Sequence, residues 1–265
     1  MPARSTLFVE ECVRVPTSGP SIACIPGIAG TTTYFRARVQ PLVVTGRRLV
    51  LVDPLGFGRS PKPFVRYTID RHVAELRRAL APHAPFTLVG HSLGARMAIA
   101  YAARFPVDVA RLVLLSLPFF ATPADAKAWA RRSGGWYHWA WTNQVAAAIM
   151  CVVSRRVFGH WLARLAPDMP EDIIRDSTTH TWRSSTSTLW EVLYRYDVSA
   201  DIARLAPAMP VTLVHGEVDQ SAPIANVRAL AEGHPTWRLV TLPGVDHNPL
   251  LRDPDAVLKE MAAAR

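Results

Sequence analysis

Ser92 lies in the sequence GHSLG (residues 90–94), at a sharp junction between two predicted elements. Residues 86–89 are apolar enough for a buried strand, and residues 93–105 carry the apolar spacing of a helix. Such a turn holds a serine above the edge of the sheet, with the amide of Leu93 and the positive end of the helix dipole beside it. This arrangement favours Ser92 as a nucleophile toward a carbonyl group, although a serine that only caps the helix would occupy the same turn.

A serine hydroxyl group becomes an effective nucleophile only when a base accepts its proton and an acid orients that base. Asp219 follows the predicted strand 211–214, and His247 follows the predicted strand 238–242. Loops at the carboxyl ends of parallel strands meet at one edge of a sheet. We therefore expect both side chains to lie near Ser92.

Other titratable side chains in this region compete for the same roles. Glu217 and Asp246 lie in the same two loops and remain alternatives for the acid. His215 ends a predicted strand, where we expect a packed structural histidine. His91 is expected to support the site from its position beside the serine.

The GHSLG turn, followed along the chain by Asp219 and then His247, resembles the α/β-hydrolase superfamily over essentially the whole sequence. The resemblance implies that Ser92 is the nucleophile, that His247 is the base and that Asp219 orients it. It disfavours epoxide hydrolases and haloalkane dehalogenases, which place an aspartate where this chain has Ser92. Some relatives carry the acid after the preceding strand, but residues 116–119 contain no carboxylate, so Asp219 is preferred.

The resemblance also implies an oxyanion hole built from two backbone amides. One is the amide of Leu93, and the other belongs to the loop that follows the family's third strand. Ile28 is the candidate donor in that loop, where Pro26 stands in place of the histidine that is common in the family. The loop of residues 53–60 also matches a family pattern, in which Asp53 is expected to be structural.

Predicted strands and helices alternate along most of the chain, which indicates a mostly parallel sheet with helices on both faces. The expected strands are residues 7–15, 21–25, 48–53, 86–89, 109–117, 211–214 and 238–242. The expected helices are residues 31–39, 70–80, 93–105, 226–231 and 254–264. We expect an α/β-hydrolase core over residues 1–118 and 207–265, interrupted by a helical cap over residues 119–206.

The predicted cap holds seven of the eight tryptophans of the chain. Large apolar side chains allow a small helical lid to dock on a core, and they also line apolar substrate pockets. Both roles are compatible with this set, which consists of Trp129, Trp136, Trp139, Trp141, Trp161, Trp182 and Trp190.

The chain has 265 residues, of which 49% are hydrophobic and 19% charged, so it can bury a large core. It has no apolar run long enough for a membrane span and no signal-peptide pattern, so we expect a cytoplasmic protein. No basic run interleaved with aromatic residues indicates nucleic-acid binding. The three cysteines show neither metal-ligand nor disulfide spacing, and the expected chemistry requires no metal or organic cofactor.

The net charge of +9 includes a basic group close to the expected active site. Arg59, Lys62 and Arg66 follow a loop that is expected to border the site. They could steer an anionic substrate or an acidic carrier protein toward it. A solvated surface group that serves only solubility is the alternative.

These features predict a serine hydrolase that cleaves a carboxylic ester or thioester of a hydrophobic acyl group through an acyl-enzyme. C–C bond hydrolases and cofactor-free haloperoxidases of the resembled family use the same three residues and remain alternatives. The same fold also serves as a ligand-binding receptor or a non-hydrolytic biosynthetic catalyst. The expected partner is a hydrophobic small molecule. Whether this substrate is anionic or bound to a carrier protein is left open, as is the oligomeric state of the protein.

Overall fold

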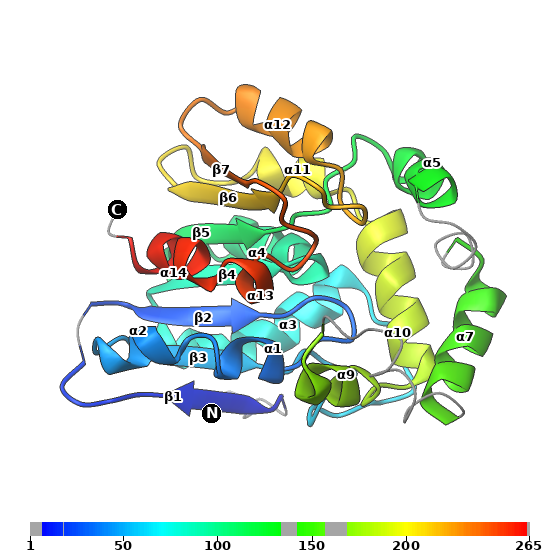
Figure 1. Cartoon of the computed structure of the whole chain (residues 1–265), viewed down its shortest axis with the longest axis horizontal. Coiled ribbons are helices and arrows are strands. Elements are labelled where there is room, and N and C mark those ends of the chain that lie inside the picture. The colour runs from blue at the N-terminus through cyan, green and yellow to red at the C-terminus, as the bar shows by residue number, and fades with distance from the viewer. Residues whose placement is uncertain (1–6, 18, 134–141, 157–168, 264–265) are drawn as a thin grey trace.

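A seven-stranded sheet, with the order β1-β3-β2-β4-β5-β6-β7, forms the centre of the protein (Figure 1). The computed structural model describes residues 7–17, 19–133, 142–156 and 169–263. In the sheet, β1 runs antiparallel to β3, and the other neighbouring strands are parallel, as the sequence predicts. The strands are β1 (Val9–Cys12), β2 (Ser21–Ile25), β3 (Leu49–Val52), β4 (Phe86–His91), β5 (Val109–Leu115), β6 (Val211–Gly216) and β7 (Arg238–Leu242).

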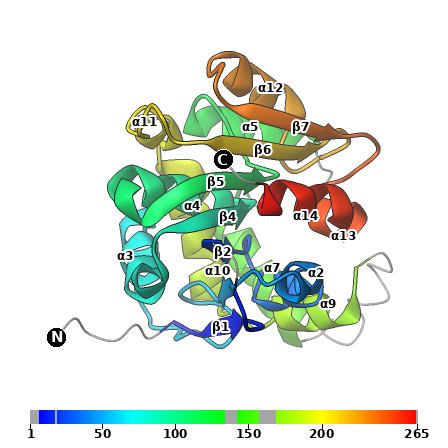
Figure 2. The ribbon, with the colours of Figure 1, turned by 90° about the vertical axis from the view of Figure 1, so that its left-hand side faces the viewer.

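Helices cover both faces of the sheet because consecutive side chains of a strand point to opposite faces (Figure 2). Val50 and Val52 of β3 belong to one apolar cluster, whereas Leu49 and Leu51 belong to another. The first cluster is completed by α3 (Ile69–Leu80), α4 (Leu93–Arg104), α11 (Val198–Ile202) and α12 (Ile224–Glu232). The second is completed by α1 (Thr33–Arg36), α2 (Gln40–Val44), α13 (Pro249–Arg252) and α14 (Pro254–Ala262).

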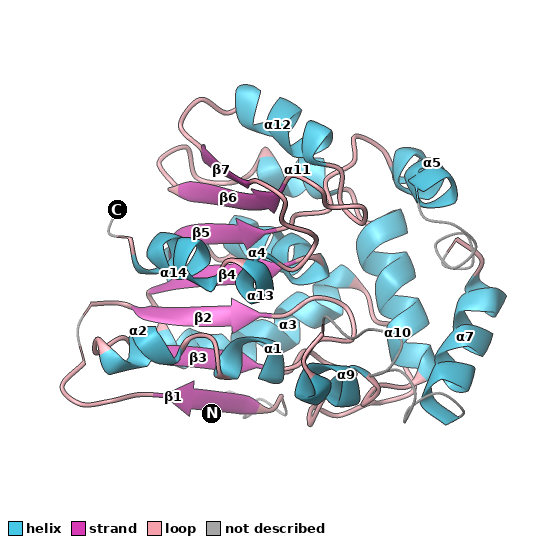
Figure 3. Cartoon of the chain, viewed as in Figure 1, coloured by secondary structure: helices cyan, strands magenta, loops and turns pink. Residues whose placement is uncertain are grey.

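A group of helices is inserted between β5 and β6 and lies beyond the carboxyl ends of the parallel strands (Figure 3). They are α5 (Pro123–Ser133), α7 (Gln144–Arg156), α9 (Glu171–Ser177) and α10 (Trp182–Thr188), and α10 continues into the π-helical segment η3 (Leu189–Arg195). These inserted helices have an apolar cluster of their own, and Ile28 of the core packs against it. Short 3₁₀ turns, η1 (Ala81–His83) and η2 (Pro106–Asp108), follow α3 and α4.

Buried polar contacts tie the inserted helices to the core. The carboxylate of Asp176, in α9, accepts hydrogen bonds from the hydroxyl groups of Thr31 and Thr33. His72 of α3 contacts the hydroxyl group of Thr188 at 3.0 Å between Nε2 and Oγ1. Because polar groups buried in this way need their partners, these contacts favour one position of the inserted helices over the sheet.

The local structure departs from the sequence-based expectation after β2. The helix predicted over residues 31–39 is a short helix, α1, followed by a second one, α2. Pro41 lies in the first turn of α2, where its missing amide proton costs nothing, and this residue suits the start of a new helix.

Across the described ranges, no helix is long and apolar enough to cross a membrane.

Candidate active site

Ser92 has the strained backbone of a nucleophile turn, with φ 53° and ψ −122°. It directly follows β4 and precedes the first residue of α4. Two glycines make this turn possible, because a Cβ atom on Gly90 would lie 2.5 Å from the Gly94 oxygen, and one on Gly94 would lie 2.4 Å from the oxygens of Ile25 and Pro26. The close approach brings the end of β2 against the start of α4.

A continuous chain of hydrogen bonds joins Ser92, His247 and Asp219. Nε2 of His247 lies 2.9 Å from the Ser92 hydroxyl oxygen, and Nδ1 lies 2.8 Å from Oδ2 of Asp219. An ionised carboxylate can only accept, so Nδ1 carries the imidazole proton and the lone pair of Nε2 faces the serine hydroxyl group. In this tautomer His247 can accept the serine proton.

Asp219 is held as a buried carboxylate. Its other oxygen, Oδ1, accepts hydrogen bonds from the amides of Ser221 at 2.8 Å and Ala222 at 2.9 Å. Burial alone would raise the pKa of Asp219, but the hydrogen bonds from His247 and from the Ala222 amide outweigh burial and lower that pKa. The charge needed to orient His247 is therefore present at neutral pH.

Two further histidines surround these groups without entering the hydrogen-bond chain. Burial lowers the pKa of His215, whose Nε2 donates to the carbonyl of Ala222 at 2.8 Å. Burial and the neighbouring His247 lower the pKa of His91 to about 3. Nε2 of His91 lies 2.9 Å from the backbone oxygen of His247, and its ring stacks on Tyr34 with 4.5 Å between ring centroids. Both histidines are thus neutral and hold neighbouring main chain in place.

Ile28 and Leu93, whose backbone amides are the candidate oxyanion donors, both line the cavity beside Ser92. Within the described ranges neither amide donates a hydrogen bond to another protein group. Gly27 lets the loop approach, since a Cβ atom there would lie 2.9 Å from the Cβ atom of Ser92. Two free amides beside a nucleophile can stabilise the negative charge that develops on a carbonyl oxygen.

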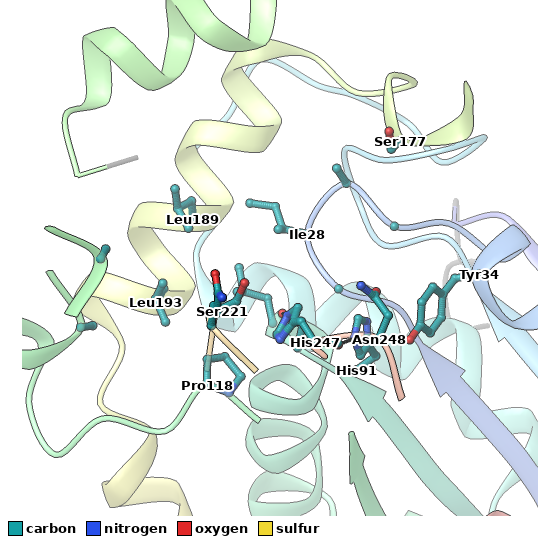
Figure 4. Close-up of a pocket in the computed structure, with 18 of the residues that line it drawn as sticks. Ile28, Tyr34, His91, Pro118, Ser177, Leu189, Leu193, Ser221, His247 and Asn248 are labelled. Atoms are coloured by element: carbon teal, nitrogen blue, oxygen red, sulfur yellow. Dashed lines mark hydrogen bonds between the residues drawn. The ribbon is translucent and has the colours of Figure 1, made fainter. Parts of the chain in front are cut away.

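Ser92 and His247 open into a cavity of about 340 Å³ between the sheet and the inserted helices. Leu189 and Leu193 lie on one side of His247 in the view of Figure 4, and Tyr34 and Asn248 lie on the other. Among the described residues, the lining contains no aspartate, glutamate, lysine or arginine. The lining of the cavity therefore combines apolar side chains with neutral polar ones.

The two alternative acids, Glu217 and Asp246, contact arginines rather than the imidazole of His247. Glu217 faces Arg228, with 3.4 Å between its Oε1 and the guanidinium group, and Asp246 accepts from Arg252 at 2.8 Å. The loop carboxylate Asp53 has a structural environment as expected, since it accepts hydrogen bonds from two backbone amides.

The basic group Arg59, Lys62 and Arg66 does not line the cavity, contrary to the expectation that it borders the site. Arg59 lies over the ring of Phe8, 4.5 Å from its centroid, and Lys62 donates to backbone carbonyls of its own loop. Arg66 pairs with Glu191 at 2.8 Å. Local partners therefore hold these side chains, and they lend no support to the hypothesis of an anionic substrate.

The tryptophans of the insertion have different surroundings. Trp129 lines the cavity, Trp190 is buried in the apolar cluster of the inserted helices and Trp182 is exposed. The others lie outside the described residues: Trp136, Trp139, Trp141 and Trp161.

Within the described part of the chain, no group of three or more metal-ligating side chains is placed to hold a metal ion.

The sequence profile of the α/β-hydrolase fold matches residues 20–254. The chain belongs to this family. This α/β hydrolase is 30% identical to 2-(acetamidomethylene)succinate hydrolase from Mesorhizobium japonicum, over 93% of this chain and 88% of that protein. It is 24% identical to a probable lysophospholipase, BODYGUARD 1 from Arabidopsis thaliana, over 92% of this chain. The match spans 58% of that longer relative.

Solved structures agree with the family assignment at the level of the fold. The hydrolase superposes on the crystal structure of E-2-(acetamidomethylene)succinate hydrolase with a TM-score of 0.72 and 24% identity, over 96% of this chain and 93% of that one. A hydrolase from Pseudomonas aeruginosa gives a TM-score of 0.74 with 22% identity, over 97% and 94% of the two chains.

Proposed function

We propose that this α/β hydrolase cleaves a carboxylic ester or thioester with an apolar acyl group, using Ser92 as nucleophile. The observation that carries the proposal is the hydrogen-bond chain from Ser92 through His247 to the buried carboxylate of Asp219, at distances of 2.9 and 2.8 Å. Its position at the cavity gives a bound carbonyl group access to the serine.

The mechanism follows from the contacts. His247 accepts the proton of Ser92 as its oxygen attacks the carbonyl carbon, while the amides of Ile28 and Leu93 stabilise the oxyanion. The protonated imidazole then donates that proton to the departing alcohol or thiol, which leaves an acyl-enzyme. A water molecule gives a proton to His247 and attacks the acyl carbon. His247 then returns that proton to the serine oxygen as the acyl bond breaks, which releases the acid and restores Ser92. Asp219 stays ionised and keeps His247 in the required tautomer throughout.

The lining of the cavity supports an apolar acyl group. Leu189, Leu193 and Phe120 present hydrocarbon beside Ser92, and the described lining holds no fixed cation for a carboxylate. The probable lysophospholipase among the relatives is named for an ester substrate of this kind. In this proposal residues 119–206 form the cap over the site, and residues 1–118 and 207–265 form the catalytic core.

A second candidate reaction comes from the relative that acts on 2-(acetamidomethylene)succinate, which is similar over 93% of this chain. The same nucleophile and base could serve such a substrate. Its two carboxylates, however, would enter a cavity in which the described residues supply no lysine or arginine. Among the described residues, the uncharged lining therefore favours the neutral acyl substrate.

Turnover of a substrate panel tests the proposal. The panel contains p-nitrophenyl acetate and octanoate, the octanoyl thioester of N-acetylcysteamine, and 2-(acetamidomethylene)succinate. We expect hydrolysis of the neutral esters or the thioester, and a loss of about 10⁴-fold or more in kcat for Ser92→Ala. Turnover of the succinate derivative alone would favour the second candidate, and binding of all four compounds without turnover would favour a receptor.

A further inference from the structure

Arg96 is a buried arginine on the helix that begins beside the nucleophile. It lies one turn after Ser92 on α4 and is only 2% exposed. Its guanidinium group donates three hydrogen bonds to backbone oxygens, from Nε to Val192 at 2.7 Å, from Nη1 to Pro118 at 2.8 Å and from Nη2 to Tyr196 at 2.7 Å. One side chain thus joins the nucleophile's helix to both ends of the insertion.

The acceptors explain why a cation is placed there. Val192 lies in the last turn of η3, and Tyr196 directly follows that segment. The last carbonyl groups of a helix lack amide partners within the helix and form the negative end of its dipole. Burial lowers the pKa of Arg96 to about 10, which leaves the guanidinium group charged at neutral pH. Arg96 therefore caps η3 from the core side.

The segment that Arg96 holds supplies apolar side chains to the lining of the cavity. Leu189 and Leu193 of η3 line it, on the opposite side from Asn248 (Figure 4). Leu189 also packs in the apolar cluster of the inserted helices. A change in the position of η3 would therefore change the shape of the cavity where Leu189 and Leu193 line it. Because Ser92 directly precedes the helix that carries Arg96, the hydrogen bonds of Arg96 tie the position of η3 to that of the nucleophile.

We propose that Arg96 is a positioning residue that fixes Leu189 and Leu193 relative to Ser92 and thereby determines which acyl chain lengths are accepted. The inference rests on the proposed function, because it requires an acyl group in the cavity. An acetyl group stays beside Ser92 and the oxyanion amides, whereas an octanoyl chain reaches further into the cavity, whose apolar lining includes Leu189 and Leu193 of η3. Displacement of η3 therefore weakens the binding of an octanoyl substrate more than the binding of an acetyl substrate.

The test compares Arg96→Lys with wild-type protein on p-nitrophenyl octanoate and acetate. A lysine keeps the charge but has one ammonium group, which cannot reach three carbonyl groups spread around a planar guanidinium. We expect the ratio of kcat/KM for octanoate to kcat/KM for acetate to fall at least tenfold, mainly through KM for octanoate. A ratio within twofold of wild type would overturn the proposal.

A matched control comes from the same helix. Arg104 lies two turns further along α4 and pairs with Asp70 at 2.9 Å and Asp201 at 3.3 Å, away from the cavity. Arg104→Lys should leave the octanoate-to-acetate ratio within twofold of wild type, whatever its effect on Tm. An equal fall in the ratio for both variants would mean that Arg96 acts only through general stability, and would overturn the proposal.

Wild-type protein supplies a measurement that does not depend on whether Arg96→Lys folds. Ser92 is labelled with an octyl or a methyl phosphonate, and hydrogen exchange of the amides of residues 189–196 is compared. The octyl adduct should slow exchange in this segment at least threefold relative to the methyl adduct, and equal rates would overturn the inference. Wild-type protein that hydrolyses neither p-nitrophenyl ester nor the octanoyl thioester would overturn the proposed function and this inference together, which distinguishes that failure from the others.

Discussion

The imidazole of His91 is hydrogen-bonded through Nε2 to the backbone oxygen of His247, at 2.9 Å. A carbonyl oxygen can only accept, so Nε2 of His91 carries the proton and donates it. His91 ends β4, and His247 follows β7, with β5 and β6 between these strands in the sheet. The residue before the nucleophile thus fixes the loop that carries the base.

His91→Leu should lower kcat for a short ester by about 10- to 100-fold, because the His247 loop loses its anchor and small misplacements of a base are costly. His91→Gln is the matched variant, since its amide can donate to the same carbonyl, and it should retain most of the activity. Steady-state kinetics on p-nitrophenyl acetate measure both. Equal losses in the two variants would contradict a role for the hydrogen bond.

Asp219→Asn should lower kcat by about 10⁴-fold while KM changes only severalfold. The amides of Ser221 and Ala222 select the side-chain oxygen of the asparagine, which turns its NH₂ group toward His247. Nδ1 of His247 then accepts, its proton moves to Nε2, and the imidazole can no longer take the proton of Ser92.

Glu217→Gln and Asp246→Asn are the controls for this assignment, because both carboxylates lie in the same two loops and pair with arginines instead. Each should keep kcat within tenfold of wild type. If Asp219→Asn retained most of the activity while either control lost it, Asp219 would not be the orienting acid.

Gly27→Ala tests the oxyanion loop. The added methyl group would lie 2.9 Å from the Cβ atom of Ser92, so the loop must shift and carry the amide of Ile28 away from the developing oxyanion. Loss of one such donor costs about a hundredfold in kcat. Gly233→Ala, whose added methyl group meets nothing nearer than 3.5 Å, should be silent in the same assay. Normal turnover by Gly27→Ala would argue against this loop as a donor.

The buried His72 should make the protein less stable in mild acid. It is 0% exposed, and burial lowers its pKa to about 3 from an ordinary value of 6.5. Between these values the unfolded chain binds a proton that the native protein excludes, so stability falls as pH drops below 6.5 and is unaffected above it. The free energy of unfolding should lose roughly 2 kcal/mol from this group between pH 7 and pH 5.

Urea unfolding of His72→Gln at pH 7 and pH 5 measures how much His72 contributes to the pH dependence of stability, because glutamine does not titrate. The difference between pH 7 and pH 5 should be smaller in the variant than in wild type by roughly that amount. The same pH dependence in wild type and His72→Gln would refute the assignment.

The sheet and the central site residues were predictable because their signals are local. Ser92, Asp219 and His247 each follow an apolar run that becomes a parallel strand, and the carboxyl ends of such strands share one edge. Ile28 came instead from the resemblance to the family, and it lines the cavity as a candidate oxyanion donor. The resemblance to a known family supplied the order of roles along the chain.

The contacts between the inserted helices and the core could not be predicted in this way. In the sequence, nothing distinguishes Arg96 from the other residues of its predicted helix. Only the folded chain brings the carbonyl groups of Pro118 and Val192 to its guanidinium group. Asp176 likewise meets Thr31 across 145 residues of sequence. Arg59 is absent from the cavity lining and lies over Phe8 instead, because following a strand-end loop does not fix where a long side chain finds its partner.

The most direct test of the account is the site of covalent labelling by an alkyl fluorophosphonate. We expect a mass increase of one adduct per chain, located by peptide mapping on Ser92. Ester hydrolysis should be lost in proportion to labelling, and Ser92→Ala should carry no adduct. A label on another residue, or no label on wild-type protein at saturating reagent, would contradict Ser92 as the nucleophile.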